Sequence, residues 1–387
     1  MGALDRKQQV QAVLCLIFFL WHMGTQWTTT LLSFLQWDTD EVMTIVDLGY
    51  IQAFGSLMNA VGSLIMGQLA DTTGAKTMFM ISVIFTSVYY AGISVARSWY
   101  GFFFLQMLRI GYQLDGTAEM YLATVTTERE RTGALMRLTV PQAAAMFFGP
   151  ILGSKIAAWT SLRISQGACG IAMFLALMPV LFFMLPTTHS IPRLASAKLR
   201  PFDYIHMLRT NPALREGLLI RGLVVSSYVC YEMISRNFLL RSFMKSTNDS
   251  AIVLLVMAVS LLFTQFFVLP IVQKRSSPRS LFQHFLIITA LQTGAYAVAY
   301  AEASTQITTS VETTDLGKAT GLSSMTQWMV HFILPIYASH IVQHYHYTYA
   351  FYTSAIISTG TLVYVTLFAK NTNARTETLL PSLTANY

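Results

Sequence analysis

The chain has 387 residues, of which 54% are hydrophobic and only 11% are charged, with a mean hydropathy of +0.51. A soluble domain carries about 25% charged residues, so most of this surface faces something other than water. The net charge of +7 is spread over short loops, which excludes a nucleic-acid-binding face, and the three cysteines lie in apolar runs, which argues against a disulfide framework.

Apolar runs long enough to span a bilayer follow one another along the chain. A spanning helix needs about 20 apolar residues. Six runs precede a polar, basic stretch and five follow it: 9–35, 45–70, 77–96, 99–126, 132–158 and 164–185, then 214–241, 250–272, 280–301, 319–343 and 346–369. The sequence therefore predicts an all-α membrane protein with about eleven transmembrane helices. We expect an N-terminal six-helix bundle (1–185), a linker (186–213), a C-terminal bundle (214–370) and a tail (371–387).

The basic residues of the loops predict the orientation in the membrane. They concentrate at the N-terminus, in every second loop and in the linker, whereas the opposite loops carry fewer and the first of these is acidic. By the positive-inside rule, the N-terminus, the linker and the tail are cytoplasmic. We expect a multi-pass integral membrane protein, with the plasma membrane favoured and an endomembrane as the alternative.

The loop between the second and third runs carries a distinctive pattern, Gly67-Gln-Leu-Ala-Asp71-Thr-Thr-Gly74-Ala-Lys76. Gly67 and Gly74 permit close backbone approach and a tight turn. Asp71 is a lone carboxylate at the membrane edge, where a cation or the N-terminus of a neighbouring helix would hold it. We expect it to close a gate between the halves of the protein; the alternative is an ordinary turn.

The two halves of the chain look alike. The segment 127–135 is echoed by 314–322, and 270–279 occupies the position of the Gly67 loop. Such a duplication is typical of transporters and predicts a substrate site between the halves. The second half is shorter, and the segment after Tyr300 is too polar to face lipid, so the tenth helix is missing or truncated. We favour a deletion in this sequence over a natural eleven-helix design; the third alternative is a polar helix that passes through the bundle interior.

These motifs resemble the major facilitator superfamily. The 67–76 loop is similar to its loop between helices two and three, although Thr72 and Ala75 replace basic residues; 105–109 is similar to its helix-four motif, and 149–153 to its antiporter motif. The resemblance covers nearly the whole chain and points to drug:proton antiporters, with the organic-cation-transporter-like branch of solute carrier family 22 as the best match. It implies two pseudo-symmetric helical bundles and proton-coupled transport of a small cationic or amphiphilic organic solute.

Charged residues within the fourth run are candidates for coupling. A charged side chain at the bilayer centre costs about 2.5–3.5 kcal/mol on insertion scales, so it is expected to face the bundle interior. Arg109 and Gln113 share one helical face and Asp115 and Glu119 share another. Two carboxylates this close in a low dielectric are not both ionised, so we expect Asp115 and Glu119 to carry the coupled proton. The alternative is that Arg109 neutralises one of them as a structural pair.

Polar side chains on other runs are candidates for substrate contact. His22 and Gln26 form a polar stripe on the first run, and histidine is the side chain that changes charge nearest physiological pH; a packing role for His22 is an even alternative. Glu232 with Tyr228 offers an anionic, aromatic wall for a cation, unless Glu232 is closed off by Arg236. The expected substrate-binding residues are His22, Gln26, Arg109, Gln113, Tyr228, Glu232, Gln327 and His331.

Small residues on the fifth run suggest a moving part. Pro150 removes a helix hydrogen bond, and Gly149 and Gly153 allow close packing, so this segment is expected to bend or slide during transport. The alternative is plain small-residue packing in a membrane bundle. The expected gating residues are Gly67, Asp71, Gly74, Lys76, Gly149, Pro150 and Gly153.

The expected partners are a small-molecule substrate, protons and the lipid bilayer, with the protein acting as a monomer. We expect no nucleic acid, cofactor or metal, and no enzymatic activity, because neither a phosphate-binding loop nor a nucleophile–base motif is present. The rival interpretation is a non-transporting membrane adaptor or an inactive truncated form of such a transporter.

Overall fold

The computed structural model describes residues 2–39, 45–186, 201–242, 292–312, 315–345 and 347–368, and this part of the chain is helical without a strand. The expected run 250–272 lies outside it, as do most of 280–301 and the tail. The first half contains α1 (Gly2–Thr39), α2 (Ile45–Thr73), α3 (Ala75–Val95), α6 (Glu128–Trp159) and α7 (Leu162–Pro179), which continues as the short η2 (Val180–Met184). These five helices are long and apolar enough to cross a membrane.

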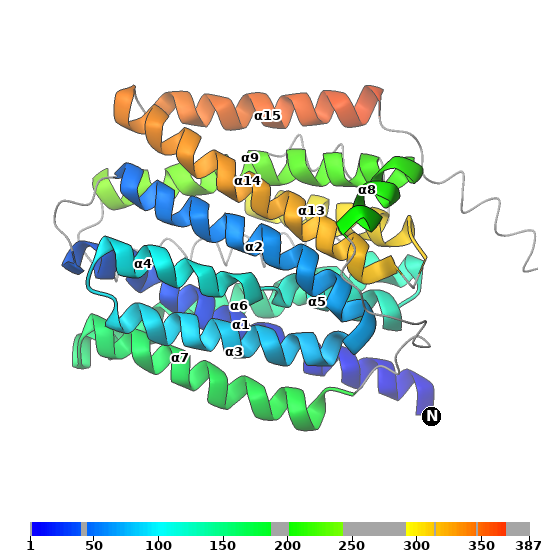
Figure 1. The fold of residues 1–387 in the computed structure, drawn as a ribbon, viewed down its shortest axis with the longest axis horizontal. Coiled ribbons are helices and arrows are strands. Elements are labelled where there is room, and N and C mark those ends of the chain that lie inside the picture. Colours follow the sequence, from blue (N-terminus) through cyan, green and yellow to red (C-terminus); the bar gives the residue numbers. More distant parts are fainter. Residues whose placement is uncertain are drawn as a thin grey trace, which may run out of the picture.

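The second half contains the linker helix α8 (Pro201–Thr210), followed by α9 (Pro212–Ser242), α13 (Gln292–Thr309), α14 (Leu316–His344) and α15 (Tyr347–Leu367). Figure 1 shows the helices side by side along the long axis of the molecule, with the first half below and the second half above. The five long apolar helices of the first half thus lie as neighbouring passes of an all-α membrane bundle.

The two halves meet chiefly along α2 and α14 (Figure 1). Gly67 of α2 lies against the backbone of Gly317 and Gly321 of α14, and a Cβ atom on Gly67 would come within 2.5 Å of the Gly317 carbonyl oxygen. Small residues let two membrane helices approach backbone to backbone. The glycine in the loop motif therefore belongs to the crossing of the halves.

The fourth expected run, 99–126, is not one continuous helix. It is divided into α4 (Trp99–Leu105), the 3-10 helix η1 (Gln106–Gly111) and α5 (Leu114–Val125), with Tyr112 and Gln113 in non-helical backbone between them. The break lies where neighbours press on the segment: Gly62 of α2 packs on the Ile110 carbonyl, and the Phe85 ring packs on Gly111. The expected shared face of Arg109 and Gln113 is therefore wrong, because the i,i+4 relation requires an unbroken helix.

The polar segment after Tyr300 is helical, because α13 runs to Thr309 rather than ending near residue 301. Ala303, Ser304 and Ile307 are fully buried, so this stretch passes through the bundle interior. The hydroxyl groups of Thr305 and Thr308 donate to carbonyl oxygens of their own helix. Of the three alternatives for this region, the arrangement corresponds to a polar helix inside the bundle.

Candidate functional site

A cavity of about 160 Å³ lies between the two halves. Its walls come from α1, α5 and α6 of the first half and from α9, α13 and α14 of the second. The lining residues are Phe18, His22, Asp115, Glu119, Leu135, Leu138, Thr139, Gln142, Met146, Tyr228, Tyr300, Ala301, Ser304 and Gln327. A mostly apolar hollow with a few convergent polar groups is the usual form of a small-molecule site.

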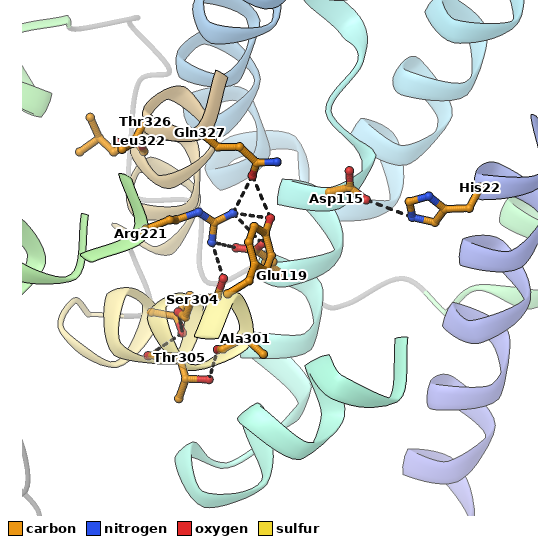
Figure 2. A network of polar contacts seen from close by, with 12 residues as sticks. His22, Asp115, Glu119, Arg221, Ala301, Ser304, Thr305, Leu322, Thr326 and Gln327 are labelled. Carbon is orange, nitrogen blue, oxygen red and sulfur yellow. Dashed lines mark hydrogen bonds and ion pairs between the residues drawn. The ribbon is translucent and has the colours of Figure 1, made fainter. Parts of the chain in front are cut away.

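Arg221 of α9 is the centre of the polar network in Figure 2. Its guanidinium is fully buried and donates to both carboxylate oxygens of Glu119 on α5, over 3.1 and 3.4 Å. It also donates to Gln327 Oε1 of α14 at 3.0 Å and to the hydroxyls of Tyr300 and Ser304 on α13. The pair thus joins one helix of the first half to three helices of the second.

Glu119 is held as firmly as its partner. Its side chain is 5% exposed, and Oε1 accepts a further hydrogen bond of 2.9 Å from the Tyr300 hydroxyl. A buried ion pair is tolerated only when good geometry and extra hydrogen bonds offset the loss of water around both charges. Both conditions are met by Glu119 and Arg221.

The second carboxylate of the cavity, Asp115, has a different partner. His22 Nε2 on α1 lies 3.5 Å from Asp115 Oδ1 (Figure 2), and the Asp115 side chain is 38% exposed while that of His22 is 9% exposed. Within the described ranges, His22 Nε2 has no hydrogen-bond partner. This pair is therefore looser and more open to the cavity than Glu119 and Arg221.

Asp115 and Glu119, which the sequence predicts to share a helical face, both lie on α5 and both line the cavity. Each has its own basic neighbour, as Figure 2 shows: His22 of α1, in the first half, lies beside Asp115, and Arg221 of α9, in the second half, pairs with Glu119.

Arg109 does not neutralise either carboxylate in the described part of the chain. Its guanidinium lies 5.8 Å from the centre of the Tyr112 ring and 5.6 Å from that of Trp328 on α14, and it donates to Gln106 Oε1 at 3.3 Å. With its amide turned to satisfy both ends, Asn59 of α2 accepts from Arg109 Nη2 at 2.9 Å. Arg109 therefore cross-links α2 and the broken fourth helix beside the second half.

The other expected substrate-binding residues divide into those near the cavity and those away from it. Tyr228 and Gln327 line it. Gln113 is buried and donates to the Asn59 carbonyl at 2.8 Å, and His331 Nδ1 lies 2.9 Å from the Gln327 carbonyl on its own helix. Gln26 does not line the cavity, and the Glu232 side chain lies outside the described residues.

The expected gating residue Asp71 lies at the N-terminus of α14. Its two carboxylate oxygens accept from the backbone N–H groups of Gly317, at 2.7 Å, and Lys318, at 3.1 Å. Exposed N–H groups and the helix dipole make such a terminus a natural site for a carboxylate. We call the contact between Asp71, Gly317 and Lys318 the α2–α14 latch.

The remaining gating residues pack within the first half. Gly74 has φ of 85°, which favours glycine at the turn between α2 and α3. Lys76 donates to the Phe182 carbonyl of η2 at 3.0 Å rather than to the second half. Gly149 and Gly153 of α6 press on the backbone and ring of Trp27 in α1, with Pro150 between them in an unbroken helix.

The linker helix α8 lies beside the α2–α14 latch. Tyr204 donates to the Leu64 carbonyl of α2 at 2.6 Å, and Asp203 lies 3.8 Å from Lys318 Nζ of α14. Burial disfavours the charge of Lys318, but its hydrogen bond to Asp315 and the carboxylates of Asp315, Asp203 and Asp71 together raise its pKa above the ordinary value. The linker thus touches both halves next to the latch.

Arg221 is the functional candidate that the sequence interpretation missed. It is an arginine inside the expected run 214–241, and an intramembrane charge is by default a candidate site residue. Arg131, at the start of α6, is a second buried arginine between the halves and donates to Thr308 of α13 at 3.1 Å. A charge inside an apolar run marks Arg221 as a candidate in the sequence, but the sequence does not show that its partner is Glu119.

Known structures share this fold over almost their whole length. The human organic anion transporter MFSD10 (TETRAN) aligns with a TM-score of 0.77 at 14% identity, covering 93% of this chain and 99% of that chain. The nucleoside transporter NupG aligns with a TM-score of 0.66 at 14% identity, covering 94% and 100%. The transporter FucP in its outward conformation gives 0.64 at 13% identity, covering 93% and 99%.

Curated relatives match a shorter stretch. The bovine hippocampus abundant transcript-like protein 1 is 27% identical over 198 residues, which is 50% of this chain and 36% of that protein. The human hippocampus abundant transcript 1 protein is 24% identical over 194 residues, or 50% and 37%. The chain therefore matches little more than a third of the length of these relatives.

The family model of the major facilitator superfamily matches residues 13–282, which is well over half of the sequence. The match agrees with the all-helical fold, the apolar helices and the likeness to solved transporters of this family. The chain is a multi-pass membrane protein and belongs to the major facilitator superfamily.

Proposed function

We propose that this protein is a secondary transporter that exchanges protons for a small cationic or amphiphilic organic solute by alternating access. The observation that carries the proposal is the cavity between the halves, whose wall holds the two carboxylates Asp115 and Glu119. Because Arg221 compensates Glu119, Asp115 supplies a negative charge toward which an organic cation is drawn. Family membership and the likeness in fold to transporters support transport itself.

The aromatic walls suit the same class of solute. Phe18, Tyr228 and Tyr300 line the cavity around the charged groups, and an organic cation is attracted both by ring faces and by apolar surface. We assign substrate contact to His22, Tyr228 and Gln327, with Asp115 as the anchor. Arg109 and Gln113 hold the broken fourth helix in place, and the α2–α14 latch closes one end of the pathway.

The proposal includes the orientation and the domain division expected from the sequence. The N-terminus, the linker and the α2–α14 latch face the cytoplasm, the residues up to 185 and those from 214 to 370 form the two rocking bundles, and the protein works as a monomer in the plasma membrane. The excess of basic residues in the linker and in every second loop supports this orientation.

The test is flux in proteoliposomes with an imposed pH gradient. Tetraethylammonium and rhodamine 6G, a small and a bulky permanent cation, serve as probes. We expect gradient-driven flux above that of protein-free vesicles, lost in the double variant Asp115→Asn/Glu119→Gln. The matched control is Asp38→Asn, which removes a carboxylate that lies 3.5 Å from Arg163, outside the cavity lining.

Two results would contradict the proposal. One is the absence of gradient-driven flux for both probes in the wild-type protein, which would favour the rival interpretation of a non-transporting membrane adaptor. The other is unchanged flux in the double variant, provided that the protein inserts and purifies as a single species.

A further inference from the structure

The two ion pairs of the cavity differ in how completely they are closed. Glu119 and Arg221 make a two-bond pair with side chains 5% and 0% exposed, and Tyr300 and Gln327 add further hydrogen bonds. Asp115 and His22 make a single 3.5 Å contact, with Asp115 38% exposed. Figure 2 shows the second pair set apart from the network around Arg221.

Removing the charge of Glu119 would leave Arg221 as a buried cation without its counter-ion. Breaking a buried pair in this way is strongly destabilising, whereas replacing both partners by neutral groups is often tolerated. A proton or a solute cation that displaced Arg221 would also have to break the bonds to Tyr300 and Gln327. Glu119 and Arg221 are therefore a fixed link between α5 and the second half.

A solute cation or a proton can reach Asp115 and His22 without breaking a network of this kind. Asp115 is reachable from the cavity, and His22 lines it and lies at the distance of one weak ion pair. A histidine side chain exists as an imidazolium or as a neutral imidazole, so Asp115 can face either an imidazolium or an imidazole with a solute cation beside it. In both states one positive charge accompanies one carboxylate.

The other ionisable groups near this pair do not change that balance. Arg109 and Tyr112 come from the broken fourth helix: Arg109 is held by Asn59 and Gln106, and the Tyr112 hydroxyl lies 3.0 Å from Thr25 Oγ1. Glu119 of α5, Arg221 of α9 and Tyr300 of α13 form hydrogen bonds with one another. From α6 the cavity receives only neutral side chains.

We propose that exchange takes place at the His22–Asp115 pair alone, one proton for one monovalent organic cation, while Glu119 and Arg221 stay paired throughout. The solute cation takes its place beside Asp115 when the proton leaves His22 for water, and a proton returns to His22 when the solute leaves. The same charge crosses the membrane in each direction, so the exchange is electroneutral. This inference rests on the proposed function and narrows it to one site.

The experiment measures flux of tetraethylammonium and rhodamine 6G in proteoliposomes under a fixed pH gradient, with and without a potential imposed by potassium and valinomycin. Protein-free vesicles give the passive leak that is subtracted. A potential acts only on net charge moved, so the initial rate is expected to change by less than about twofold. A severalfold acceleration or slowing by the potential would overturn the inference even if gradient-driven flux is present.

Variants test which pair exchanges. His22→Gln and Asp115→Asn are each expected to abolish the dependence of flux on the pH gradient. The double variant Glu119→Gln/Arg221→Met removes the second pair as a unit and is expected to keep the dependence of flux on the pH gradient and the pH profile of wild type, whatever its absolute rate. Loss of gradient dependence in this folded double variant, or its retention in Asp115→Asn, would overturn the inference.

The two proposals fail in different ways. If wild-type protein shows no gradient-driven flux of either probe, the proposed function fails and the inference fails with it. If wild-type flux follows the gradient but responds to the potential, or requires Glu119 and Arg221, only the inference fails.

Discussion

Asp71 is the residue whose sequence context most directly determined its place in the structure. Its carboxylate accepts from two backbone N–H groups at the start of α14, where the helix dipole also favours a negative charge. We expect Asp71→Asn to destabilise the protein by about 1–3 kcal/mol, because the single side-chain oxygen of Asn cannot replace both carboxylate oxygens and its amide N–H₂ must face a backbone donor. The thermal midpoint of the purified protein in detergent measures this.

The neighbouring Thr72 provides the control for this prediction. Its hydroxyl donates to the Leu69 carbonyl of its own helix, at 2.9 Å. We expect Thr72→Ala to leave the midpoint close to that of wild type. If the two variants behave alike, the α2–α14 latch does not stabilise the contact between the halves.

Two residues, Asp71 and Arg221, show which contacts can be predicted from the sequence and which cannot. Asp71 was predictable because a carboxylate at a membrane edge beside a tight turn needs only a generic partner, the end of a neighbouring helix. The position of Arg221 depends on a specific partner, Glu119. This partner lies 102 residues away in the sequence and comes near only when the two halves pack together. A sequence rule states that such a charge is paired, but the identity of the pair depends on the fold.

At the scale of elements, α13 departs most from the expectation. Hydropathy treats every spanning helix as if it faced lipid, whereas the polar face of α13 turns toward α6. The prediction of a continuous fourth helix is wrong for a related reason. It assumes a helical period through the stretch where α2 and α3 press on the backbone and the helix is broken. The continuous apolar helices were predictable because the bilayer itself sets their length.

The interior position of α13 has a measurable consequence. The Thr308 hydroxyl accepts from Arg131 Nη1 at 3.1 Å, and both side chains are buried. We expect Thr308→Val to lower stability by about 1–3 kcal/mol, because the buried guanidinium loses an acceptor. Thr309→Val is the control, since its hydroxyl donates to the Gln306 carbonyl of the same helix. A rise in thermal midpoint for Thr308→Val would indicate that this face of α13 contacts lipid.

The linker helix α8 also contributes to the contact between the halves. The Tyr204 side chain is 6% exposed and its hydroxyl donates to the Leu64 carbonyl of α2. We expect Tyr204→Phe to cost about 0.5–1.5 kcal/mol, the typical net value of one hydrogen bond, without disturbing the apolar packing of the ring. The thermal midpoint of this variant is compared with that of Tyr100→Phe, a control at a residue that is 68% exposed. Equal midpoints for the two variants would show that the bond adds nothing.

On the scale of the whole molecule, the two halves are joined twice at the same end of the bundle, the end that carries the α2–α3 turn and α8 (Figure 1). On one side, Asp71 of α2 binds the start of α14. On the other, Thr132 of α6 donates to Thr305 of α13 at 2.8 Å, next to the bond between Arg131 and Thr308. If the halves rock about the central cavity, both contacts must open together.

A disulfide across the second contact tests that motion. With the native cysteines replaced, the pair Thr132→Cys/Thr305→Cys places two thiols where the hydroxyl oxygens are 2.8 Å apart, a spacing compatible with a disulfide. A protease site inserted between α7 and α8 reports the cross-link, because the two halves stay joined after cleavage only when the bond has formed. We expect oxidation to lower probe flux at least about tenfold and reductant to restore it, since a closed end blocks alternating access.

A cross-link within one half is the matched control. Thr28 of α1 lies 3.7 Å from Cys169 of α7, so Thr28→Cys in a chain that keeps Cys169 forms a pair inside the first bundle. Because a rigid half still rocks as a body, its oxidation is expected to leave flux within about twofold of the reduced protein. Unchanged flux with the halves demonstrably cross-linked would mean that this end of the bundle stays closed during transport, and that the solute takes a path that does not require the halves to separate there.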